Sequence, residues 1–253
     1  MKSILRQLLW LSHEIGSESR DLVQLTEGNV SARVDADRFL VKAAGTRLGT
    51  LTPADVVECN TKRIVTILET PLMDLSDLDR ALVEARVDPT AKLPSPEAAF
   101  HSILLQLEGV QFVAHCSPTS CLQIVCSRMG EAFADQRIFP EQVIHCGAAS
   151  VFVPYTDPGS PLAREIQGRI GVFMRRGHGP SPKLILLQNR GIVAIGPTAE
   201  SVLNTILAAE KAARVFVGTA ALGGPAVLKP GQVQKIEQPT AQTMTPRVRF
   251  LKQ

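Results

Sequence analysis

The chain has 253 residues, of which 45% are hydrophobic and 20% charged, and its formal net charge is +3. This length and composition suit one large domain with a sizeable core. The charge is small and no run of Lys or Arg forms a stripe, so we expect no nucleic-acid partner. No stretch approaches the roughly 18 apolar residues that a membrane span needs, and we expect no membrane partner either.

Apolar periodicity in the first part of the chain predicts one helix and then strands. The expected elements are a helix over 3–16, a turn at Gly28 and Asn29 that opens a strand, a second strand over 39–42, a helical turn and strand from 52–57, and a hairpin partner over 64–68. The glycine of the turn lets the backbone approach a ligand closely. This part of the chain is expected to form an antiparallel sheet.

The central stretch combines a helix start with the end of a buried strand. Ser95 can cap a helix, and Glu97 places negative charge in its first turn. Residues 110–114 predict a buried strand that ends at His115. Ligands in α/β proteins bind at strand ends, so Glu97 and His115 are predicted to share a reaction centre. Each also has a structural interpretation, Glu97 as a helix-start charge and His115 as a core histidine.

The remaining chain alternates between helical and strand patterns. The expected elements are a helix near 77–85, a loop-rich segment over 127–142, strands over 143–145 and 151–153, a helix over 161–174, strands over 184–187 and 192–195, and a long helix through 202–216. Periodicity ends beyond Gly218. We therefore predict one domain over 1–220 and an extended C-terminal tail over 221–253.

Five landmarks occur in a fixed order: GNVS, FLVKAAG, PSPE with His101 four residues after the Glu, HCS and QNRG. In this order they resemble the class II aldolase/adducin family, which includes L-fuculose-phosphate aldolase, L-rhamnulose-phosphate aldolase and L-ribulose-phosphate 4-epimerase. The resemblance covers roughly residues 1–220. It implies an α/β fold, a three-layer α/β/α sandwich with a largely antiparallel central sheet.

The resemblance also implies a site for a sugar phosphate. Glu97 matches the family's acid/base. The positions that match the family's substrate- and phosphate-binding motifs are Gly28, Asn29, Gly45 and Ser95. Family members hold Zn²⁺ with three histidines, and the metal polarises the substrate carbonyl. The partner implied for this chain is therefore a small sugar phosphate or carboxylate.

The metal positions of this chain depart from the family pattern. His115 matches the first ligand, whereas Ser117 and Arg190 replace the other two histidines. A hydroxyl is a poor zinc ligand, and a guanidinium has no free lone pair. We expect the usual Zn²⁺ site to be without stoichiometric metal. Arg190 is a candidate to bind an anionic ligand or to stand in for the charge of the metal.

Other assignments stay open at this stage. His115, His145, Cys116 and Cys146 offer donors for an alternative metal site, and Cys146 stands where several family aldolases have a catalytic tyrosine. His101 is expected to be a structural partner. The odd number of five cysteines suits reduced thiols in a cytoplasmic protein.

Two functions remain. One is an aldehyde-lyase that acts on a phosphorylated sugar or related small molecule. The other is a catalytically silent family member that binds a ligand or serves as a scaffold. The resemblance also implies a homotetramer.

Overall fold

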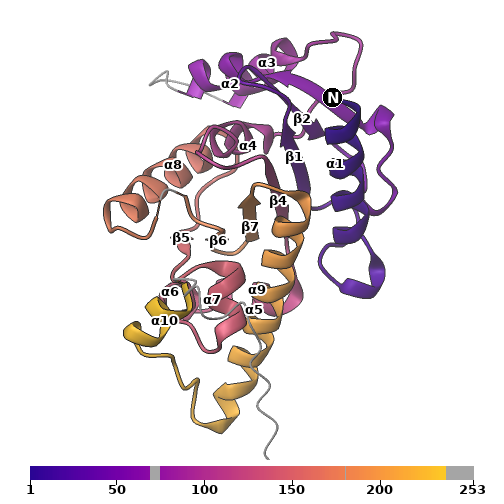
Figure 1. Cartoon of the computed structure of the whole chain (residues 1–253). Coiled ribbons are helices and arrows are strands. Elements are labelled where there is room, and N and C mark those ends of the chain that lie inside the picture. The colour runs from indigo at the N-terminus through magenta and orange to yellow at the C-terminus, as the bar shows by residue number, and fades with distance from the viewer. Residues whose placement is uncertain (69–74, 180, 238–253) are drawn as a thin grey trace, which may run out of the picture.

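A seven-stranded mixed sheet forms the centre of the computed structural model, which describes residues 1–68, 75–179 and 181–237 (Figure 1). The strand order is β3-β2-β1-β4-β7-β6-β5. The strands are β1 (Asn29–Arg33), β2 (Arg38–Lys42), β3 (Val56–Asn60), β4 (Phe112–Cys116), β5 (Val151–Val153), β6 (Leu184–Leu187) and β7 (Gly191–Gly196). Only the β5–β6 pair is parallel among these strands, which confirms the predicted largely antiparallel sheet.

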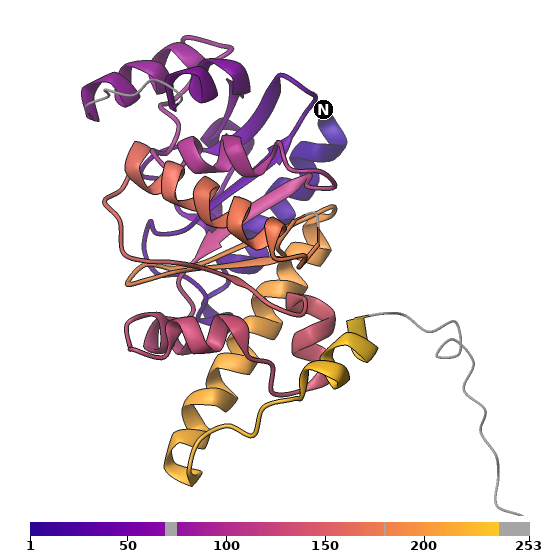
Figure 2. The ribbon, with the colours of Figure 1, turned by 90° about the vertical axis from the view of Figure 1, so that its left-hand side faces the viewer.

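Helices cover both faces of the sheet, as Figure 2 shows. The helices are α1 (Lys2–Ile15), α2 (Thr61–Leu68), α3 (Leu75–Ala85), α4 (Ala98–Leu104), α5 (Thr119–Val125), α6 (Gly130–Asp135), α7 (Pro140–Cys146), α8 (Ser160–Arg175), α9 (Ala199–Thr219) and α10 (Pro230–Glu237). Helices α1, α5 and α9 pack on one face, and α2, α4 and α8 on the other. The expected three-layer sandwich is present.

Strand β4 shows how the two cores arise. Successive side chains of a strand point to opposite faces, so Phe112, Ala114 and Cys116 join the core beneath α9, whereas Val113 joins the core beneath α4 and α8. All five residues of β4 are buried. Because helices cover both faces of this central strand, the sequence of β4 is apolar at every position except His115.

Two predicted strands are helices. Residues 64–68 belong to α2 and not to a hairpin, and Ile64 and Leu68, four residues apart, form its buried face. Residues 143–145 belong to α7, where Val143 and Cys146 face the core three residues apart. A short apolar run does not by itself distinguish the two periods.

The segments predicted to be loop or tail also contain helices. Residues 127–142 include α6 and the first turn of α7. Within 221–253, residues 230–237 form α10, which packs on α7, and residues 238–253 lie outside the described part of the chain. The predicted helices over 3–16, 77–85, 161–174 and 202–216 are all present with small shifts at their ends.

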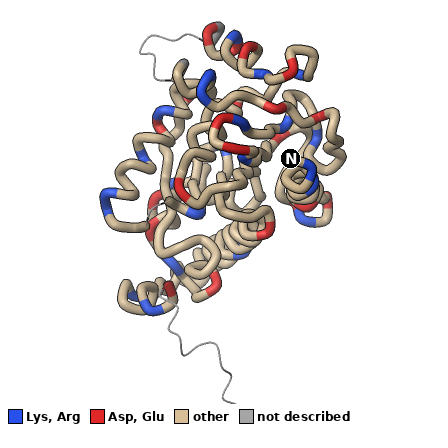
Figure 3. The backbone as a smooth tube through the Cα atoms, turned by 45° about the horizontal axis from the view of Figure 1, so that its top comes forward, with Lys and Arg blue, Asp and Glu red and all other residues tan. Residues whose placement is uncertain are grey.

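Lys and Arg are interspersed with Asp and Glu over the outer helices and loops (Figure 3). Across the described ranges, no helix combines the length and the apolar character needed to cross a membrane.

One edge of the sheet brings the predicted site residues together. Because β4 runs antiparallel to β1 and to β7, its C-terminal end meets the N-terminal ends of both neighbours. The C-terminal end of β2 lies at the same edge, since β2 is antiparallel to β1. Asn29, Lys42, His115 and Arg190 thus stand at the ends of four adjacent strands.

Candidate functional site

Glu97 and His115 form a direct pair at this edge. His115 Nδ1 lies 2.9 Å from both carboxylate oxygens of Glu97. The predicted juxtaposition is present, although α4 begins at Ala98 and Glu97 stands just before it. A turn leads into the helix, in which the Ala98 N–H donates to the Ser95 carbonyl at 2.9 Å. Ser95 thus shapes the turn that presents Glu97 to the strand end.

Two glycines hold the neighbouring strands close to β4. A Cβ at Gly28 would lie 3.1 Å from the His115 carbonyl oxygen, and one at Gly191 would lie 2.4 Å from the Cys116 carbonyl oxygen. Both have positive φ, +79° and +135°, which disfavours other residues. Gly28 thereby brings Asn29 into register with His115, and Gly191 fixes the turn that carries Arg190.

Several buried polar atoms around Glu97 have no hydrogen-bond partner within the described residues. They are Asn29 Oδ1 and Nδ2, His101 Nε2, His115 Nε2 and Ser117 Oγ. Asn29 and His115 are directly opposite on β1 and β4, so their side chains share one face of the sheet. Each unsatisfied buried group costs about 1–3 kcal/mol. Their gathering at one strand edge is typical of a site that receives a polar ligand.

His101 lies one turn into α4, beneath the same site. Its Nδ1 shares a hydrogen bond of 2.6 Å with Ser31 Oγ of β1, and its ring stacks against Phe100 at a centroid distance of 4.7 Å. Burial lowers the pKa of His101 to about 3, although Glu97 opposes this shift. His101 is therefore neutral at physiological pH, and its contacts fit the structural role expected for it.

Glu97 is ionised in this environment. Burial opposes its ionisation, but His115, His101 and Arg190 together outweigh burial and lower the pKa of Glu97 to about 2. The Arg190 guanidinium makes no hydrogen bond to any described residue and is half-buried. It therefore provides positive charge near Glu97 while its donors remain available.

Sequence reasoning missed Lys42 at the end of β2. Its side chain is 2% exposed, and Nζ donates to the Thr46 carbonyl at 2.8 Å and to the Thr26 carbonyl at 3.2 Å. Burial lowers the pKa of Lys42, and the charge of Glu97 opposes that shift. The available signal was a lysine inside the apolar strand sequence FLVKAA, where only side chains with a specific partner are normally buried.

The donors at this site do not fit a three-histidine zinc centre. No three His, Cys, Asp or Glu side chains of the described residues gather in a way that could hold a metal ion. Cys116 and Cys146 lie in the core beneath α9, whereas His115 lies on the α4 side, 6.2 Å from the Phe100 ring centroid. The alternative donor set that includes these cysteines is therefore divided between the two faces of the sheet.

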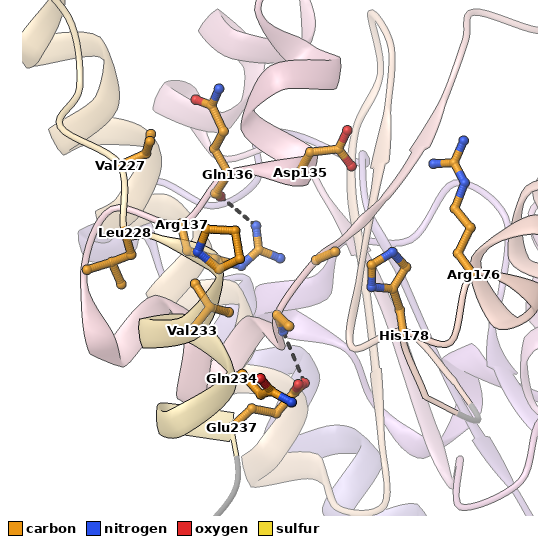
Figure 4. Close-up of a pocket in the computed structure, with 13 residues that line it drawn as sticks. Asp135, Gln136, Arg137, Arg176, His178, Val227, Leu228, Val233, Gln234 and Glu237 are labelled. Atoms are coloured by element: carbon orange, nitrogen blue, oxygen red, sulfur yellow. Dashed lines mark hydrogen bonds between the residues drawn. The ribbon is translucent and has the colours of Figure 1, made fainter.

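A separate cavity of about 530 Å³ lies between the C-terminal ends of α6 and α8, the segment that follows α7, and α10 (Figure 4). Its buried charge, Arg137, is 2% exposed and donates to the Gly147, Ala134 and Gln136 carbonyls and to Ser150 Oγ. These carbonyls stand at the C-terminal ends of α6 and α7, where the helix dipole favours a cation. Arg137 thus stabilises the packing of α6 and α7.

Comparisons with known proteins agree with the fold. The family profile described as "Class II Aldolase and Adducin N-terminal domain" matches residues 7–217. A putative aldolase/epimerase/decarboxylase, YgbL of Klebsiella pneumoniae, is 17% identical with a TM-score of 0.71 and covers 93% of this chain and 98% of its own. An L-fuculose 1-phosphate aldolase is 16% identical with a TM-score of 0.69, over 94% of this chain and 95% of its own.

Two further proteins extend the comparison. The N-terminal class II aldolase domain of a conserved protein from Thermoplasma acidophilum is 22% identical with a TM-score of 0.68, over 83% of this chain and 92% of its own. The uncharacterized oxidoreductase YuxG of Bacillus subtilis is 24% identical over 203 residues, which are 77% of this chain and 27% of YuxG. The chain thus spans only about a quarter of the length of that curated relative.

Proposed function

Because the chain belongs to the class II aldolase and adducin family, we propose that its Glu97 site binds a phosphorylated sugar or a related carboxylate and cleaves it as an aldehyde-lyase. The Glu97 site comprises Asn29, Glu97, His115, Ser117 and Arg190. One observation carries the proposal: an ionised, half-buried carboxylate lies beside buried polar atoms that lack partners. The bound ligand supplies those partners.

The chemistry assigns a distinct role to each charged group. An aldehyde-lyase breaks a C–C bond once a base takes a proton from the hydroxyl on one carbon, while negative charge collects on the carbonyl oxygen of the other fragment. Glu97 takes this proton and later returns it. His115 Nδ1–H fixes the carboxylate, and Arg190 stabilises the developing negative charge.

The remodelled metal position belongs to the same proposal. Ser117 and Arg190 stand where the family resemblance places two zinc ligands, and a fixed guanidinium would repel a divalent cation beside it. We therefore propose that Arg190 provides the positive charge, and that the purified protein holds no stoichiometric Zn²⁺ at this position. Metal analysis of protein purified without chelator tests this point. One zinc per chain that is lost on His115→Ala would contradict it.

Turnover and binding are tested together. Ketose 1-phosphates, among them L-fuculose 1-phosphate and L-rhamnulose 1-phosphate, are offered to the wild type, and release of dihydroxyacetone phosphate is followed with a coupled assay. We expect release with at least one ketose 1-phosphate and its loss in Glu97→Gln. Absence of both binding and release across the panel would refute the proposed site.

A catalytically silent binding protein is the second candidate. The replacement of two ligand histidines by Ser117 and Arg190 favours it, since Arg190 can hold an anion without any reaction. The same titrations distinguish the two candidates. Binding without product release identifies a binding or scaffold protein, and binding with product release identifies the lyase.

The oligomeric state and the cellular location of the protein follow from the same family resemblance. We propose a homotetramer in the cytoplasm, with the aldolase-like domain over 1–220 and the segment 221–253 near a subunit boundary. Closed cyclic symmetry is common among soluble proteins. Light scattering at micromolar concentration tests the assembly, and a monomeric mass would contradict it.

A further inference from the structure

Arg190 presents a planar fork of N–H donors that the described part of the chain leaves unused. Its side chain is half-buried, and no hydrogen bond or ion pair joins its guanidinium to a described residue. Together with His115 and His101, its charge keeps Glu97 ionised, although Arg190 and Glu97 form no ion pair. Charges withdrawn from water are normally paired with an opposite charge. The guanidinium can therefore receive an anionic ligand while Glu97 stays free to react.

The main chain holds Arg190 at the strand end that carries Ser117. The Arg190 N–H donates to the Leu187 carbonyl at 3.1 Å, which closes the tight turn between β6 and β7. Asn189, just before it, has a φ of +58°, a left-handed conformation that asparagine tolerates. Gly191 follows, and a Cβ there would lie 3.2 Å from Ser117 Cα. The backbone on both sides of Arg190 is thus fixed in a tight turn beside Ser117.

The histidine at the same strand end requires an O–H donor. Glu97 is ionised and accepts the hydrogen on His115 Nδ1 at 2.9 Å. Nε2 of the neutral ring then has a lone pair, and this atom is buried without a donor. Ser117 Oγ, two residues further along the chain, is also buried without a partner. A complementary ligand therefore offers hydroxyl groups to Glu97 and His115, and a planar anionic group to Arg190.

We propose that Arg190 makes the Glu97 site prefer a hydroxylated 2-oxo acid, in which a carboxylate adjoins the carbonyl group, over a ketose 1-phosphate; this inference rests on the proposed function. A carboxylate oxygen and the adjacent carbonyl oxygen of a 2-oxo acid can lie in one plane, and two parallel N–H groups of a guanidinium fit such a pair. In a ketose 1-phosphate, a CH₂–O group takes the place of the carboxylate and offers no negative oxygen in that plane.

Cleavage of a 4-hydroxy-2-oxo acid uses the groups that the site already has. Glu97 removes the proton of the C4 hydroxyl, and the electrons of that O–H bond form the carbonyl of an aldehyde. The C3–C4 bond breaks, its electron pair forms a C2–C3 double bond, and negative charge collects on the C2 oxygen that Arg190 contacts. Glu97 then returns the proton to C3. The products are a shorter 2-oxo acid and an aldehyde, so no oxidant or reductant is needed.

A role for Arg190 that is limited to the charge of Glu97 predicts different behaviour. In that case, removal of the Arg190 charge weakens every ligand of the site to the same extent. Arg190→Gln removes the charge, and Arg190→Lys keeps the charge without the planar fork. Arg128→Gln is the matched control, because Arg128 is exposed in the loop between α5 and α6.

Calorimetric titration with pyruvate and hydroxyacetone decides between these roles, since the two ketones differ only in a carboxylate or a CH₂OH group. We expect the wild type to bind pyruvate, and oxalate as a planar analogue of its enolate, at least about 10-fold more tightly than hydroxyacetone. Arg190→Gln should weaken pyruvate and oxalate binding by about 10- to 100-fold, the range for loss of a hydrogen bond to a charged group, and hydroxyacetone binding by less than about 3-fold. Arg190→Lys should retain part of the affinity for pyruvate, and Arg128→Gln all of it. Equal wild-type affinities for the two ketones, or equal losses in Arg190→Gln, would overturn the inference.

Turnover tests the preference without any variant. The wild type should release pyruvate from 4-hydroxy-2-oxopentanoate with a higher kcat/KM than it releases dihydroxyacetone phosphate from L-fuculose 1-phosphate. The reverse order would overturn the preference. A crystal structure of the wild type with oxalate gives the geometry: two oxygens of oxalate within hydrogen-bond distance of the Arg190 guanidinium support the inference, and oxalate bound elsewhere refutes it.

Dihydroxyacetone phosphate separates failure of this inference from failure of the proposed function. If the wild type binds dihydroxyacetone phosphate but neither pyruvate nor oxalate, the preference for a 2-oxo acid is wrong and the proposed function stands. If the wild type binds none of the three compounds, the proposed function itself is refuted.

Discussion

The buried polar groups of this protein fall into two kinds, and Arg137 and the Glu97 site represent them. Around Arg137, each nitrogen of the guanidinium donates to a main-chain carbonyl or to Ser150. At the Glu97 site, the Asn29 amide, His115 Nε2 and Ser117 Oγ are equally buried but have no partner among the described residues. Burial alone therefore does not identify function. A satisfied group stabilises the fold, whereas a gathering of unsatisfied groups marks a place for a ligand.

Glu97→Gln gives the largest expected effect on function. Removal of a general base typically lowers the rate by about 10²- to 10⁴-fold. The loss should appear in kcat with little change in KM, because the amide keeps the size of the side chain and can still bond to His115. Steady-state rates of product release over a range of ketose 1-phosphate concentrations measure both constants. Glu108→Gln, on an exposed residue, is the control, and an unchanged kcat in Glu97→Gln would assign the base elsewhere.

Arg137→Met gives the largest expected effect on stability. The substitution leaves the Gly147 and Gln136 carbonyls without their donor inside the fold, and a loss of about 3 kcal/mol or more is expected. Denaturant unfolding measures the change in the free energy of unfolding. Arg176→Met provides the control, because Arg176 lines the same cavity but is exposed. Equal stability of the two variants would remove the distinction between the two kinds of buried group.

Local pattern and landmark order together predicted much of this molecule. The strand that ends at His115 and the helix start at Glu97 were predicted from adjacent stretches with clear signals. The structure places His115 Nδ1 2.9 Å from the Glu97 carboxylate. The long helices α8 and α9 each have a continuous apolar face, and the sequence predicted them equally well. The strand predictions for residues 64–68 and 143–145 were wrong because apolar runs this short fit a strand and a helix alike.

Lys42 was unpredictable for a different reason. Its burial depends on the Thr26 turn, the Thr46 loop and the Ser95 segment closing around it, and no local pattern contains that information. A lysine in a five-residue strand is ordinarily at the surface. The closure of these three segments, which only the three-dimensional structure shows, buries the side chain.

The pH dependence of the free energy of unfolding tests the buried groups near Glu97, and His101 makes the first contribution to it. Its pKa is about 3 in the folded protein and about 6.5 when unperturbed, so below pH 6.5 the unfolded chain binds a proton that the folded chain does not. Stability therefore falls as pH drops from 6.5 towards 3, by at most about 1.4 kcal/mol per pH unit for one proton. Glu97, whose pKa is lowered to about 2 from 4.5, adds a second loss below pH 4.5.

The variant His101→Asn isolates the first component. Its stability should decline less steeply than that of the wild type between pH 6.5 and 4.5, whereas His178→Asn, at an exposed position, should follow the wild type. Chemical denaturation at several pH values measures the slope, which is independent of any constant loss of stability caused by the substitution. Parallel slopes for wild type and His101→Asn would show that His101 is protonated equally in both states.

Ser117→Ala gives the smallest expected effect and tests the Glu97 site most directly. Ser117 Oγ is buried without a partner, so removing it discards no hydrogen bond of the free protein and relieves the cost of an unsatisfied hydroxyl. The free energy of unfolding should stay constant or rise by up to about 1 kcal/mol. Ser150→Ala, which removes the acceptor of the Arg137 Nη2 donor, should lower it by a similar amount. With a bound ligand, the wild type should be more stable than Ser117→Ala, because a sugar phosphate that hydrogen-bonds to Ser117 stabilises the wild type more than the variant. Thermal unfolding of both variants with and without dihydroxyacetone phosphate measures these differences, and a loss of stability in ligand-free Ser117→Ala would mean that Ser117 has a structural partner in solution.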